Sequence, residues 1–156
     1  MNKNIIFILL IFFFINNCGY KALNSSKNLD INISKIDSSG VKKINKVIED
    51  NLKAYSNIKN KSKNINLNII SQKKIVPMSK DSRGDPLNHK MEIQVEIKYF
   101  MNDDLINERK YVENFQYPNM DNKFDLSNYE RTIEKNLVNK IIRSIILNLI
   151  TLTNDS

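Results

Sequence analysis

The sequence predicts an α+β fold: a four-stranded, mostly antiparallel sheet with two helices packed on one face, in the order β-α-β-β-β-α. Apolar and polar residues alternate over residues 91–99, as in a strand with one buried face. Apolar residues recur at helical spacing over residues 41–55 and again over a longer segment, residues 133–152. Strands with one apolar face and helices with one apolar stripe bury these surfaces by stacking in two layers.

The first strand and the first helix are expected near the start of this domain. Leu29, Ile31 and Ile33 alternate with polar residues, which indicates a half-buried strand. Ser38-Ser39-Gly40 is expected to break the chain. The helix that follows should have about four turns, with one apolar stripe formed by Val41, Ile44, Val47, Ile48, Leu52 and Tyr55.

The second strand follows a polar, basic connector at residues 60–64. Alternation begins again with Ile65, Leu67 and Ile69, and the strand can extend to Val76, where Pro77 would interrupt it. The irregular segment at residues 78–88 is then expected to form an exposed loop.

The third and fourth strands are expected to form an antiparallel hairpin. Residues 91–99 give the clearest strand pattern, with one apolar and one charged face. Asn102-Asp103-Asp104 predicts a tight turn. The next strand should cover about residues 106–117 and carry three aromatic residues on one face, namely Tyr111, Phe115 and Tyr117.

The last element is predicted to be a long helix after a turn at residues 118–123. Ser127 and Glu130 have the spacing of a capping box, which would mark the first turn. Ile142 and Ile146 broaden the apolar stripe, so this helix should cover the sheet. The stripe comprises Ile133, Leu137, Ile141, Ile145, Leu149 and Leu152.

The N-terminal segment has the pattern of a bacterial lipoprotein export signal. Lys3 precedes an apolar run at residues 5–15, and Cys18, the only cysteine, follows Asn16-Asn17. Eleven apolar residues are too few to span a bilayer as a helix. We therefore expect residues 1–17 to be a signal peptide, Cys18 to carry lipid, residues 18–27 to be a tether, and residues 28–153 to form one domain. An uncleaved anchor, favoured by the bulky Phe12-Phe13-Phe14, is the alternative, and Asn16 and Asn17 replace the small residues that usually precede the cleavage site.

Composition and charge narrow the functional classes. The 156 residues carry a net charge of +7, which favours anionic partners, and an exported protein is not expected to bind nucleic acid. The single histidine, His89, lacks the further ligands that a metal site requires. The sequence contains no recognisable Ser-His-Asp or Cys-His set and no glycine-rich phosphate loop. We expect neither enzyme activity nor a cofactor, and Arg83-Gly84-Asp85, an adhesion tripeptide, is explained by a sharp loop.

Three segments resemble the LPS-assembly lipoprotein LptE family. The start Cys18-Gly19-Tyr20-Lys21-Ala22-Leu23 resembles the family's Cys-Gly-aromatic-basic-x-Leu opening. The loop with Arg83-Gly84, followed by the strand at residues 91–99, resembles its central loop and hairpin. Residues 117–152 resemble its final turn and long helix, including the acidic residue that opens this helix, here Glu130.

The resemblance implies an outer-membrane lipoprotein, lipid-anchored at the periplasmic face. Such proteins plug and help assemble the β-barrel LptD and bind lipopolysaccharide during its delivery to the outer leaflet. Arg83 and Lys123 fall where the family places basic residues, so both are expected to contact lipopolysaccharide phosphates. Lys80 and Lys90, together with Lys73-Lys74, are expected to assist.

Two questions stay open at the level of the sequence. The surface that contacts the barrel could be the charged face of the strand at residues 91–99 or the loop around Pro86-Leu87. The function could instead be that of a generic membrane-anchored periplasmic lipoprotein that binds lipid or peptide, or of an exported hydrolase with an unfamiliar site.

Overall fold

The computed structural model describes residues 31–56, 58 and 61–154 of the chain. Its elements are β1 (Ile31–Gly40), α2 (Lys42–Leu52), the 3-10 turn η2 (Lys53–Tyr55), β2 (Lys63–Lys80), β3 (Pro86–Met101), β4 (Asp104–Pro118) and α3 (Lys123–Asn154). The expected signal peptide, Cys18 and the tether at 18–27 lie outside the described residues, as does Leu29.

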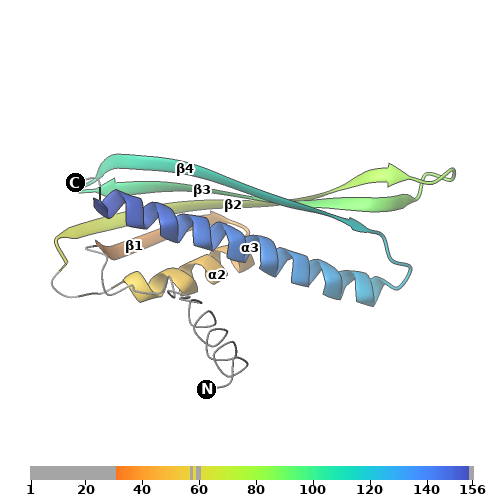
Figure 1. Cartoon of the computed structure of the whole chain (residues 1–156), viewed down its shortest axis with the longest axis horizontal. Coiled ribbons are helices and arrows are strands. Elements are labelled where there is room, and N and C mark those ends of the chain that lie inside the picture. The colour runs from red at the N-terminus through yellow and green to blue at the C-terminus, as the bar shows by residue number, and fades with distance from the viewer. Residues whose placement is uncertain (1–30, 57, 59–60, 155–156) are drawn as a thin grey trace, which may run out of the picture.

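The four strands form one mixed sheet in the order β1-β2-β3-β4. β1 and β2 are parallel, whereas β2–β3 and β3–β4 are antiparallel. Both helices lie on the same face of the sheet, and α3 runs along most of its length (Figure 1). The predicted α+β class and element order are confirmed.

The core lies between the sheet and the two helices. The alternation predicted for residues 91–99 is confirmed, because every second side chain of this part of β3 is fully buried. These side chains are Met91, Ile93, Val95, Ile97 and Tyr99. The expected helical stripes face them, and η2 completes the first with a buried Tyr55. The helical residues of this core are Ile44, Ile48, Leu52, Ile133, Leu137, Val138, Ile141, Ile142, Ile145 and Leu149.

β1 extends through the segment that was expected to break the chain. Ser38, Ser39 and Gly40 pair with residues of β2, the last with Ser71. Gly40 has a φ of +95°, and a Cβ atom there would lie 2.0 Å from the carbonyl oxygen of Ser71. The chain therefore turns from strand to helix at a glycine because no other residue fits that close approach.

The prediction that Pro77 ends the second strand was wrong. β2 continues to Lys80, and Pro77 pairs with His89 of β3 before a register shift. Since β1 pairs with β2 only as far as Ser71, the later part of β2 is an edge strand among the described strands, where proline is tolerated. The expected loop at residues 78–88 contracts to residues 81–85, and the β2–β3 hairpin projects beyond the helices (Figure 1).

The start of α3 also differs from the prediction. The helix begins at Lys123, where Asn122 caps it: Oδ1 accepts hydrogen bonds from the backbone N–H of Phe124 at 2.9 Å and of Asp125 at 3.4 Å. Ser127 and Glu130 therefore lie within the helix and do not form its capping box. The predicted turn before β4 is confirmed by positive φ values at Asn102 and Asp103, 50° and 68°.

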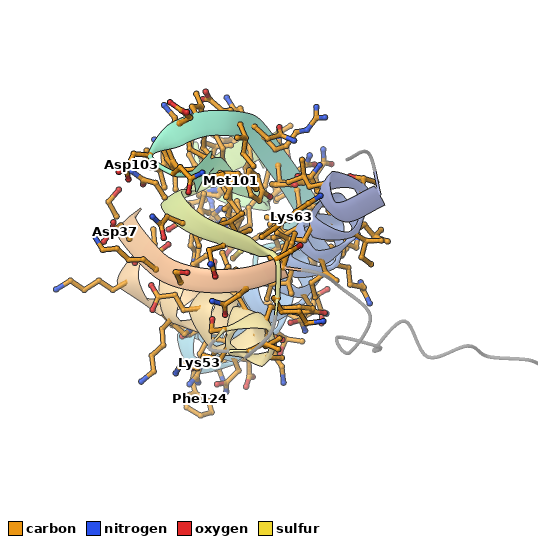
Figure 2. All side chains as sticks on the ribbon, turned by 90° about the vertical axis from the view of Figure 1, so that its left-hand side faces the viewer. Asp37, Lys53, Lys63, Met101, Asp103 and Phe124 are labelled. Carbon is orange, nitrogen blue, oxygen red and sulfur yellow. The ribbon has the colours of Figure 1, made fainter. Side chains whose placement is uncertain are left out.

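The two ends of the molecule differ in what they carry. One end, on the left in Figure 1, holds the first residue of β1, the β3–β4 turn and the last turn of α3. The other end holds the β2–β3 loop and the β4–α3 connection. Figure 2 looks from the first end and shows Phe124 at the bottom, on the helix side; this side chain is 70% exposed.

Candidate functional site

The loop at residues 81–85 is closed by its own hydrogen bonds. The N–H of Asp81 donates to the carbonyl oxygen of Asp85 at 2.8 Å, and that of Gly84 to the carbonyl oxygen of Asp81 at 3.1 Å. Oδ1 of Asp81 accepts from the N–H groups of Arg83 and Asp85, each at 2.9 Å. The bond from Asp85 and those from Arg83 and Gly84 lower the pKa of Asp81, so its carboxylate stays ionised as the acceptor at the centre of the loop.

Arg83 is presented at the tip of this loop between two acids. Its side chain is 81% exposed, and its Nε lies 3.4 Å from Oδ2 of Asp81 and 3.9 Å from Oδ2 of Asp85. Ion pairs this exposed stabilise little and are screened by salt. Both contacts involve Nε, and the terminal nitrogens of Arg83 make no hydrogen bond with a described residue.

Lys123 begins α3, and the start of this helix lies at the same end of the molecule as the β2–β3 loop, which carries Arg83 (Figure 1). The link between them is Asn119, whose N–H donates to the carbonyl oxygen of Leu87 at 2.8 Å and whose Nδ2 donates to that of Pro86 at 3.0 Å. These bonds fasten the β4–α3 connection to the base of the hairpin loop. Lys123 is the first residue of α3, not part of the turn before it as expected.

The other expected cations are divided between surfaces. Lys80 ends β2 and pairs in register with Pro86, beside the loop. Lys90 alternates with the buried Met91, so it lies on the sheet face opposite the helices, where its Nζ is 3.1 Å from Glu92. Lys80, Arg83 and Lys123 thus share one end, while Lys90 faces another surface.

Lys73 is part of an ion-pair cluster that the sequence reading missed. Its Nζ lies 2.6 Å from Oε2 of Glu134, and Nζ of Lys43 lies 2.9 Å from Oε1 of the same carboxylate. Glu134 is 8% exposed. Burial alone would raise its pKa, but the hydrogen bonds and charges of Lys73 and Lys43 outweigh burial and lower the pKa. The sequence offered one signal for this cluster: Glu134 lies between Ile133 and Leu137 of the predicted apolar stripe, where an acidic residue needs a buried partner.

A second buried contact fixes the end of β4 to α3. Tyr117 is 1% exposed, and its hydroxyl donates to Oε1 of Glu130 at 2.6 Å. Its ring stacks on His89 with centroids 5.6 Å apart and meets Tyr129 edge-on at 6.2 Å. His89 therefore packs as an aromatic ring here. In the described part of the chain, no group of three or more His, Cys, Asp or Glu residues could hold a metal ion.

No described element covers the sheet face opposite the helices (Figure 1). Most of its side chains are polar or charged, but the alternation also places Ile70, Val76, Phe100 and Val112 there. This face includes the charged face of β3, one of the two surfaces suggested for a protein partner. Ion pairs cross it, from Lys98 to Glu96 and to Glu108, both at 3.7 Å. The alternation of β2, β3 and β4 places on this face Asn66, Asn68, Gln72, Lys74, Lys90, Glu92, Gln94, Glu96, Lys98, Glu108, Lys110, Asn114 and Gln116.

The fold is similar to those of several solved proteins. Rare lipoprotein B from Shewanella oneidensis matches with a TM-score of 0.56 and 12% identity, over 78% of this chain and 98% of that one. A candidate lipoprotein from Caulobacter crescentus CB15 matches with 0.58 and 11%, over 84% and 96%. Lipoprotein B from Nitrosomonas europaea matches with 0.53 and 13%, over 76% and 83%.

These similarities show that the α+β architecture is shared over 76–84% of this chain and 83–98% of the solved chains. No protein-family model and no curated protein matches the sequence. Among the described residues, neither helix combines the length and apolar character needed to cross a bilayer.

Proposed function

We propose that this chain is an outer-membrane lipoprotein that acts as LptE does. It is anchored through Cys18 at the periplasmic face, plugs and helps assemble an LptD-like β-barrel, and binds lipopolysaccharide during its delivery to the outer leaflet. The observation that carries the proposal is the combination of a fold shared with proteins named as lipoproteins and a lone cysteine placed directly after an export signal.

The position of the start of β1, relative to the β2–β3 hairpin loop, supports this arrangement. β1 begins at Ile31, at the end of the molecule opposite the hairpin loop (Figure 1). Cys18 precedes Ile31 by 13 residues, which span at most about 45 Å when extended. A tether that enters at this end leaves the hairpin loop free to point away from the anchor, toward a ligand that passes through a barrel.

The proposed lipopolysaccharide contacts are Arg83 and Lys123, with Lys80 and Lys90 assisting. Arginine binds phosphate in a bidentate way and lysine binds it as a point charge. The chain has 24 lysine and arginine residues, so the test must separate the effect of these particular positions from the effect of net charge. Arg83→Glu with Lys123→Glu should weaken lipopolysaccharide binding by at least about tenfold. Lys110→Glu with Arg143→Glu changes the net charge equally, at exposed positions elsewhere, and serves as the matched control.

The outcomes of this binding measurement are distinct. Equal loss in both double variants would assign the effect to overall charge, and unchanged affinity in the first would remove these residues from the site. The melting temperature of each variant checks that the fold is retained.

The proposed barrel contact is the polar, uncovered face of β3. A photoreactive residue at Gln94, on this face, should cross-link to a partner of several hundred residues in intact membranes, whereas one at Lys135, on the helix side, should not. Copurification of such a barrel supports the proposal. Extraction of a hydrophobic ligand by the protein alone, with no barrel, would favour the generic lipid-binding lipoprotein instead.

A further inference from the structure

A groove opens between the two helices, on a surface that the proposed function does not use. Its volume is about 350 Å³. The part from α2 consists of Lys43, Ile44, Val47 and Asn51, and the part from α3 consists of Arg131, Glu134, Lys135, Val138 and Asn139.

The floor of the groove is apolar. Ile44 and Val138 form its base but are only 1% and 2% exposed, so Val47, which is partly buried against the same core, supplies the exposed apolar surface. These side chains come from helices that also bury residues against the sheet, so the floor is held in place by the core. Such a floor favours the hydrocarbon part of a ligand.

The rim of the groove is cationic. Lys43, Arg131 and Lys135 line it, and the one carboxylate among the lining residues, Glu134, is buried and shared between Lys43 and Lys73. Arg131 donates from Nη2 to Oδ1 of Asn128, and Lys135 has no hydrogen-bond or ion-pair partner among the described residues. The groove therefore offers exposed positive charge beside a hydrocarbon floor.

We propose that this groove binds one anionic phospholipid of the membrane that carries the protein. The phosphate lies against Arg131 and Lys135, and the glycerol and the first part of an acyl chain lie on Val47, above the buried Ile44 and Val138. Phosphate matches the arginine and lysine donors, and the apolar floor separates a phospholipid from free phosphate. The membrane setting rests on the proposed lipid anchor, whereas the lining of the groove does not depend on it.

The test is a titration of the full chain held in phosphatidylcholine nanodiscs. Short-chain dihexanoyl-phosphatidylglycerol, added below its micelle concentration, should produce saturable shifts of the methyl signals of Ile44, Val47 and Val138. Arg131→Gln with Lys135→Gln should raise the dissociation constant by about tenfold. Lys46→Gln with Arg143→Gln removes one exposed cation from each helix outside the groove and should change it less than about twofold.

Several outcomes would overturn the proposal. They are equal shifts with dihexanoyl-phosphatidylcholine, equal saturation with inorganic phosphate alone, and an unchanged constant in the Arg131 and Lys135 variant. Shifts produced by a poly-glutamate peptide and not by the lipid would assign the groove to an acidic protein partner. The titration needs neither a barrel nor lipopolysaccharide, so its failure is distinct from a failure of the proposed function.

Discussion

The carboxylate of Glu134 lies 2.6 Å from the ammonium group of Lys73, although 61 residues separate them in the chain. Glu134 belongs to α3 and Lys73 to β2, and Lys43 of α2 approaches the second carboxylate oxygen at 2.9 Å. One side chain thus joins both helices to the sheet. Because Glu134 is buried, the loss of its charge would leave two ammonium groups without their partner.

Glu134→Gln should therefore lower the free energy of unfolding by about 2 kcal/mol, less than a fully buried pair because Lys43 is largely exposed. Urea denaturation measures the change. The control is Glu108→Gln, which removes an exposed strand pair with Lys98 and should cost less than about 0.5 kcal/mol. Equal losses in the two variants would contradict a special role for Glu134.

The contribution of Glu134 should depend on pH. Its folded-state pKa is lowered below the reference value of 4.5, so its stabilisation is present above pH 4.5 and is lost as the pH falls through the folded-state value. The difference in unfolding free energy between the wild type and Glu134→Gln should shrink below pH 4.5. Urea titrations at neutral and acidic pH test this, and a constant difference would contradict it.

The two glycines with positive φ form a matched pair. Gly84→Ala, in open space at a φ of +91°, should cost about 1 kcal/mol from backbone strain alone. Gly40→Ala adds a contact of 2.0 Å with backbone and should cost several times as much, about 3 kcal/mol or more. Thermal melts that rank the two variants in the opposite order would argue against the close approach of β1 and β2.

The cap of α3 can be tested directly. Asn122→Ala removes the acceptor for the N–H groups of Phe124 and Asp125 and should destabilise the protein by about 1 kcal/mol. Ser127→Ala, at the position that the sequence suggested as the cap, should change stability by less than about 0.5 kcal/mol. The reverse result in chemical denaturation would restore the capping box.

Tyr117→Phe should loosen the end of the molecule that carries the hairpin loop. The variant keeps the ring contacts with His89 and Tyr129 but removes the hydrogen bond to Glu130, at a cost of about 1.5 kcal/mol. Amide exchange should accelerate at Asn119, which connects to Leu87. Tyr129→Phe, whose ring contact also survives, is the control, and equal acceleration there would contradict the assignment.

The regular elements were predictable because burial follows periodicity. The alternation over residues 91–99 and the stripe from Ile133 to Leu149 depend on local spacing, which the sequence displays. Pro77 and the pair Ser38-Ser39 were misread because their settings depend on pairing. β1 stops beside Ser71, which leaves an edge for Pro77, and Ser38 and Ser39 still pair with β2 before the chain turns at Gly40. Local residue preferences cannot predict such contacts, because the partners are far apart in the sequence.

For the proposed lipopolysaccharide contacts, the sequence predicted which residues carry positive charge but not which groups lie beside them. The sequence placed Arg83 in an exposed loop, but not the two aspartates beside its Nε. It grouped Lys73 with the surface cations, although that side chain turns toward the buried Glu134. Which face a lysine occupies depends on strand register, and what it pairs with depends on tertiary packing. The phosphate contacts of Arg83 and Lys123 stay predictions.

The self-bonded loop at residues 81–85 has a thermodynamic consequence. The backbone N–H groups of Arg83 and Asp85 already donate to Asp81, so this loop loses little conformational entropy when it binds a ligand or a partner. Association at this end of the molecule should therefore proceed without the large heat-capacity change of coupled folding. Selectivity at this loop would depend on shape complementarity with its preformed backbone. Calorimetry over a range of temperatures would measure the heat-capacity change of binding.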